Sequence, residues 1–139
     1  MTPTEFKLWE KIKDFSIADS SSDISFTDRL ARENSWTTEY AIRVIYEYKK
    51  FIFMMCVSGH PLTPSDQVDQ VWHLHLIFTE SYWIEFCEKT LGNKIHHGPA
   101  KRSASEKNKY IDLYQKTKGL YTHFFNQKPP EEIWPPISI

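Results

Sequence analysis

The longest run of sequence compatible with a single helix lies between Pro64 and Gly92, because no glycine or proline occurs between them. A straight α-helix of about 28 residues would be about 42 Å long. A compact chain of 139 residues has a radius of gyration of only about 14 Å. We therefore expect residues 64–91 to form a helix that is bent or broken, since a straight one would cross the whole molecule.

Helical patterns also occupy the rest of the chain. Apolar residues recur at steps of three and four in residues 5–15, 26–33, 37–59 and 103–124. No stretch shows a convincing alternating pattern of a β-strand. The sequence therefore predicts an all-α fold, a single compact helical bundle of about five helices in one domain, residues 1–139. The proline-rich C-terminal segment carries Trp134, which we expect to dock onto the bundle.

The best-defined of these helices is expected to follow Thr37 and to stop at Gly59, since glycine and a nearby proline are typical of a helix end. Its apolar residues lie on one side of the helix. Arg43, Glu47 and Lys50 fall on the opposite side, which we expect to face water.

Composition narrows the class of protein. The chain has 17 basic and 18 acidic side chains, so its overall charge favours neither nucleic acid nor an anionic membrane. It has two cysteines, too few for a disulfide framework, and neither a signal sequence nor a membrane span is apparent. We therefore expect a cytoplasmic protein. The lysine-rich residues 101–128 are expected to form a solvated face, which makes nucleic acid an unlikely partner.

Histidines and carboxylates gather in one part of the sequence. The candidate metal ligands are Asp69, His73, His75, His96 and His97. Imidazole and carboxylate groups bind zinc and iron, so we expect a divalent metal ion, zinc or iron. If the site is catalytic, metal-assisted hydrolysis is the expected class of reaction. The chain contains neither an H-E-x-x-H motif nor a G-x-G-x-x-G motif, which argues against zincin and dinucleotide-binding chemistry.

Helical geometry separates these candidates. At about 100° per residue, Asp69 and His73 lie on the same face of a helix, whereas His75 lies about 200° from His73. His75 can therefore join the other two only if the helix breaks at that point. His96 and His97 would have to come from a loop that follows the helix.

The same residues also permit a purely structural interpretation. His73 would then hydrogen-bond to Asp69, His75 would be a buried neutral histidine, and the pair at residues 96–97 would stack on a tryptophan. Under this alternative the chain is a non-catalytic protein-interaction module, whose histidine and tryptophan cluster locks the helices together.

The pattern D-x-V-D-x-V-W-H-x-H at residues 66–75 is followed by T-x-S-Y-W, F-C and G-N-K-I-H-H-G-P. It resembles the glycine-rich domain-containing protein-like family, and in particular its bacterial branch. R-L-A-R-E-N-S-W at residues 29–36 and P-P-E-E-I-W-P at residues 129–135 extend the resemblance over about residues 26–136. Residues 1–25 would form an N-terminal helix and loop before this core.

The resemblance implies no settled activity. It implies that the polar positions of the motif are Asp66, Asp69, His73, His75, His96 and His97. The chain lacks the glycine- or cysteine-rich region often attached to such domains. The resemblance therefore implies that the chain acts alone or through a protein partner.

Overall fold

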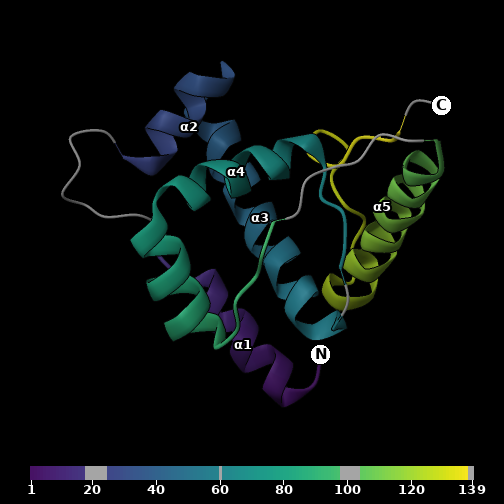
Figure 1. Cartoon of the computed structure of the whole chain (residues 1–139), viewed down its shortest axis with the longest axis horizontal. Helices are drawn as coiled ribbons and strands as arrows, with labels where there is room; N and C mark the ends of the chain where they lie inside the picture. The colour runs from purple at the N-terminus through teal and green to yellow at the C-terminus, as the bar shows by residue number, and fades with distance from the viewer. Residues whose placement is uncertain (18–24, 60, 98–103, 138–139) are drawn as a thin grey trace.

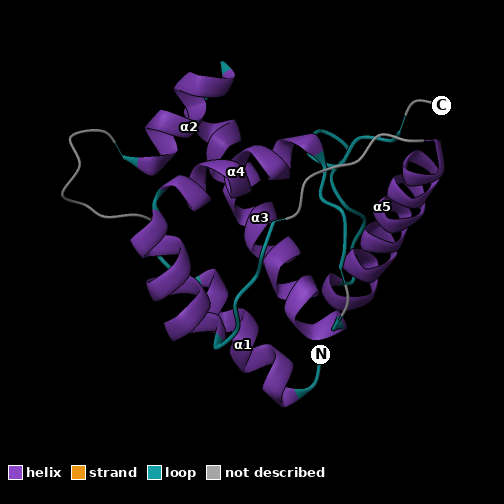
Figure 2. Cartoon of the chain, in the orientation of Figure 1, coloured by secondary structure: helices purple, strands orange, loops and turns teal. Residues whose placement is uncertain are grey.

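The described part of the chain consists of helices and connecting loops (Figure 2). The computed structural model describes residues 1–17, 25–59, 61–97 and 104–137. The α-helices are α1 (Pro3–Lys13), α2 (Phe26–Asn34), α3 (Thr38–Ser58), α4 (Asp66–Ile77) and α5 (Ala104–Phe125), and the π-helix η1 spans Glu80–Leu91. No strand occurs in these four ranges, so the predicted all-α class is confirmed. The predicted loop at residues 18–24 and the predicted helix start at residue 103 lie outside the described residues.

Side-chain caps fix where four of the helices begin. Thr2, Ser25, Thr37 and Ser65 each accept a hydrogen bond from the backbone N–H three residues further on. The cap at Ser65 starts α4 at Asp66, two residues later than expected from Pro64. These bonds satisfy backbone donors that the first turn of a helix leaves without partners.

α3 is the central helix and contacts α1, α2, α4 and α5 (Figure 1). Val44, Tyr48 and Phe51 of α3 are completely buried. Burying side chains of this size contributes about 1.5–3 kcal/mol each to the stability of the fold. The helix ends at Gly59, whose φ of 71° lies in the left-handed region that glycine adopts without strain. None of the helices in the described residues is long and apolar enough to cross a lipid bilayer.

The long run after Pro64 forms two helices, so the predicted break is confirmed. α4 ends at Ile77, and Phe78 has φ −83° and ψ 72°, which does not continue a helix. η1 follows as a π-helix, which is wound more widely than an α-helix. In Figure 1, α4 crosses the middle of the view, and η1 turns away from it on the left. The break lets both halves pack within one compact molecule.

The expectation that Glu47 and Lys50 face water is wrong, because they are only 5% and 3% exposed. Lys50 Nζ lies 3.4 Å from Glu47 Oε2 and donates a hydrogen bond to Tyr121 Oη of α5 at 2.7 Å. Trp134 docks as predicted, and its Nε1 donates to Glu47 Oε1 at 3.0 Å. Segments far away in the sequence therefore cover this side of α3. Arg43 of the same helix is exposed, as predicted.

Candidate metal centre

The first part of the site comes from α4. Asp69 and His73 lie one turn apart on this helix, so their side chains project from the same face. Asp69 Oδ2 lies 3.4 Å from His73 Nε2. The side chain of His73 is 51% exposed and that of Asp69 is 27% exposed. The pair therefore sits at the surface, where small solutes can reach it.

The second part of the site comes from the non-helical residues 94–97, which follow η1. His97 reaches α4, where its Nε2 lies 2.5 Å from Asp69 Oδ1. Its ring centre lies 4.6 Å from that of His73 and 4.3 Å from that of Trp72. Because a carboxylate only accepts hydrogen bonds, Nε2 of His97 carries the hydrogen in this contact. Two separate elements thus converge on one carboxylate.

These three side chains form a set of metal-ligating groups. One ligand atom from each of Asp69, His73 and His97 can be chosen so that all three lie within 4.8 Å of one another. Two imidazoles and one carboxylate suit zinc, and they also match the three-residue set of non-haem iron(II) sites. The coarser prediction, a polar site of Asp and His residues with a metal-binding composition, is therefore confirmed.

The structure does not bring His75 to this cluster. The helix breaks at Phe78, which is too late to turn His75 towards His73, and the His75 side chain is completely buried. Its Nδ1 lies 2.8 Å from Tyr48 Oη and its Nε2 lies 3.1 Å from Ser81 Oγ. Burial, and secondarily the charge of Lys49, lowers the pKa of His75 to about 3. His75 is therefore a neutral core residue that joins α3, α4 and η1.

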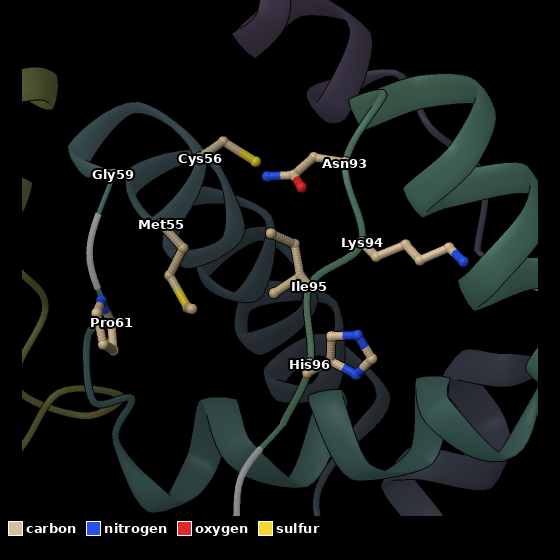
Figure 3. A pocket seen from close by; sticks show the side chains of 8 residues that line it. All are labelled: Met55, Cys56, Gly59, Pro61, Asn93, Lys94, Ile95 and His96. Carbon is tan, nitrogen blue, oxygen red and sulfur yellow. The ribbon is translucent and has the colours of Figure 1, made fainter.

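His96 also lies apart from the cluster. Figure 3 shows Asn93 and Ile95 on one side of the backbone and Lys94 and His96 on the other. This alternation sends His96 and His97 in different directions. The exposed His96 ring lies 5.1 Å from the ring of Trp83 in η1. It lines an open pocket of about 300 Å³ to which none of the three cluster residues contributes. Asp66, the sixth polar position of the motif, is exposed at the first turn of α4.

Sequence reasoning missed a buried network behind the site. Trp72 Nε1 donates to Tyr82 Oη at 2.8 Å, and Tyr82 Oη donates to the backbone carbonyl of Ile95. Tyr82 is completely buried and Trp72 is 3% exposed. The available signal was the chemistry of these side chains, since a buried tyrosine or tryptophan needs a partner for its polar atom. Nothing in the spacing shows which partner that is.

Comparison with known proteins identifies the family of the chain. The family model described as UCP032817-like matches residues 14–129. No curated protein and no solved structure matches the chain. The expected membership of the glycine-rich domain-containing protein-like family is wrong, because the matching family is a different one and nothing else indicates that resemblance. Since the match covers most of the sequence, the chain belongs to the UCP032817-like family.

Proposed function

We propose that this chain binds a divalent transition metal ion, zinc or iron, through Asp69, His73 and His97. The observation that carries the proposal is the grouping of their ligand atoms within 4.8 Å of one another. The two histidines come from different elements, α4 and the segment after η1, so an ion held here would also tie these elements together.

The distances support an ion after a small rearrangement. Two ligands of one tetrahedral zinc ion, each about 2.1 Å from the metal, lie about 3.4 Å apart. The 3.4 Å between Asp69 Oδ2 and His73 Nε2 already fits this value. The 2.5 Å between Asp69 Oδ1 and His97 Nε2 is a direct hydrogen bond, so the ion replaces its hydrogen. Because Oδ1 and Oδ2 are different oxygens of one carboxylate, that hydrogen bond must open before a single carboxylate oxygen and both imidazoles can bind the ion.

Three protein ligands leave at least one coordination position open to water, which is the arrangement of catalytic rather than structural zinc sites. The exposed side chain of His73 leaves this position accessible from solvent. A metal ion lowers the pKa of a bound water to about 7, so metal-assisted hydrolysis is the class of reaction that we propose for a catalytic site.

Titration of protein purified without a histidine tag tests the proposal. We expect about one equivalent of zinc or iron(II) to bind, and excess ion to raise the melting temperature through mass action. Asp69→Asn, His73→Ala and His97→Ala should each weaken binding at least tenfold. His123→Ala is the matched control, because His123 is exposed on α5 and lies outside the cluster. Less than a tenth of an equivalent of metal, with no thermal shift on adding either ion, would reject the proposal.

A second candidate function is a non-catalytic protein-interaction module that acts with a protein partner. It is supported by the contacts of His97 with Asp69 and Trp72, which hold the segment on α4 without an ion. Exposed Phe6, Ile42 and Ile77 provide apolar contact points for a partner. This alternative predicts that His97→Ala lowers the melting temperature equally with and without a chelator. A metal-dependent difference would contradict it.

A further inference from the structure

The segment that carries His97 is held in place by η1. Asn93 N–H donates to the carbonyl of Cys87 at 3.0 Å, and Tyr82 Oη donates to the carbonyl of Ile95. The Ile95 side chain is itself buried, at 7% exposure. The chain therefore leaves η1 with two backbone groups fixed before it reaches His97.

Tyr82 contacts the site from two directions. Its hydroxyl fixes the carbonyl two residues before His97, and it accepts a hydrogen bond from Trp72 Nε1 at 2.8 Å. Trp72 precedes the ligand His73 in α4, and its ring lies 4.3 Å from that of His97. One hydroxyl thus links the segment of one histidine to the helix of the other, although Tyr82 is not itself in the ligand group.

We infer that Tyr82 is a positioning residue of the proposed metal centre, which holds His97 in place for an ion bound to Asp69 and His73. The inference rests on the proposed function. Its physical basis is preorganisation, because a ligand held in place by outer contacts loses less freedom when the ion binds. Without the hydroxyl, the carbonyl of Ile95 and the indole N–H of Trp72 each lose a buried partner. The segment then loses one of the contacts that position it, and keeps those of His97 with Asp69 and Trp72 and that of Asn93 with Cys87.

The test compares Tyr82→Phe with Tyr114→Phe in the full chain. Tyr114 is a matched control, because it is also a buried tyrosine whose hydroxyl donates to a backbone carbonyl, that of Pro135 at 2.7 Å. Zinc affinity is measured by competition with a chromophoric chelator, and cobalt(II) absorption at saturation reports the coordination geometry. We expect Tyr82→Phe to weaken zinc binding about 10–100-fold and to change the cobalt spectrum. Tyr114→Phe should change neither, although it also removes a hydrogen bond of a buried tyrosine.

The outcomes distinguish this inference from the proposed function. If the unmodified chain binds zinc and Tyr82→Phe binds it equally well with the same cobalt spectrum, Tyr82 is only a core residue and the inference is overturned. If Tyr114→Phe weakens binding as much as Tyr82→Phe, a general loss of stability explains the effect, and the inference is again overturned. If the unmodified chain binds no metal, the proposed function fails and this inference fails with it. Should Tyr82→Phe not fold, Trp72→Phe, which breaks the other bond of Tyr82 Oη, is measured in the same way, and a zinc affinity equal to that of the unmodified chain would overturn the inference.

Discussion

Two histidines separated by one residue in α4 have opposite environments. The side chain of His73 is 51% exposed beside Asp69, whereas His75 is completely buried among Tyr48, Tyr82 and Phe86. The rotation of about 100° per residue explains the difference, because it turns alternate residues of a helix to nearly opposite faces. Helical spacing therefore pairs Asp69 with His73 directly from the sequence. The partners of His75 depend on how α3 and η1 pack, which spacing does not reveal.

Replacing His75 should weaken the fold and leave metal affinity intact. His75→Leu removes the ring nitrogens next to Tyr48 Oη and Ser81 Oγ. A buried polar group left without its partner costs about 1–3 kcal/mol, so we expect a loss of this size in the free energy of unfolding. Urea unfolding measures it, and exposed His123→Ala should have almost no effect. Unchanged stability of His75→Leu would show that these bonds contribute nothing.

The cysteine thiols should react slowly in the native chain. Burial raises the pKa of Cys56 to about 11 and also raises that of Cys87. Since the thiolate is the nucleophile, about 0.1% of Cys56 is reactive at pH 8, against about a quarter for an ordinary thiol of pKa 8.5. Iodoacetamide alkylation of Cys56, followed by mass spectrometry, should be at least about 100-fold slower in the folded chain than in urea. The native rate should rise about tenfold per pH unit up to about pH 11, and a rate already constant at pH 8 would contradict the raised pKa.

At the scale of elements, α3 shows what a single helix pattern can and cannot predict. Its start after Thr37, its end at Gly59 and its apolar side follow from local chemistry, and the structure agrees with them. The burial of Glu47 and Lys50 does not follow, because α5 and the C-terminal segment bring Tyr121 and Trp134 over them. A contact between residues more than 70 positions apart leaves no trace in the spacing of either segment.

The buried ion pair of α3 should matter much more than the exposed one. Lys50→Met leaves the carboxylate of Glu47 buried without its cation, which costs about 3–5 kcal/mol in comparable pairs. Arg43→Met, also in α3, breaks the exposed pair with Glu132 of the C-terminal segment and should cost less than about 1 kcal/mol. Denaturant unfolding of both variants measures the difference. Equal effects would show that the pair is not shielded from water.

For the whole molecule, the sequence predicts the helical class better than it predicts the site. Helix caps and glycine ends act locally and can be read from the sequence, and the break between α4 and η1 is predictable from the length of the run and the compactness of the chain. The site requires two elements to meet. Of the five candidate ligands, the structure brings Asp69, His73 and His97 together, and it leaves the other two histidines elsewhere. Only the fold determines which histidine of the pair at residues 96–97 turns towards α4.

If the proposed ion binds, it should stabilise the entire chain. Free zinc at 100 times its dissociation constant adds about 2.7 kcal/mol to the free energy of unfolding, which raises the melting temperature by about 10 °C in a chain of this size. EDTA should reverse the shift. Protons compete with the ion for the ligand imidazoles, so the shift should be smaller at lower pH. A calorimetric scan at pH 7.5 and pH 5.5 measures this, and an equal shift at both values would exclude histidine ligation.

The interruption at Phe78 has a consequence for how this sequence can vary. The helix before the break, α4, carries Asp69 and His73, and the helix after it, η1, carries Tyr82. Inserting or deleting one residue at this break would change the position of Tyr82 relative to Asp69 and His73. Such a change would separate ligands from their support without altering any of them. The number of residues between α4 and η1 therefore matters more for the site than which residues they are.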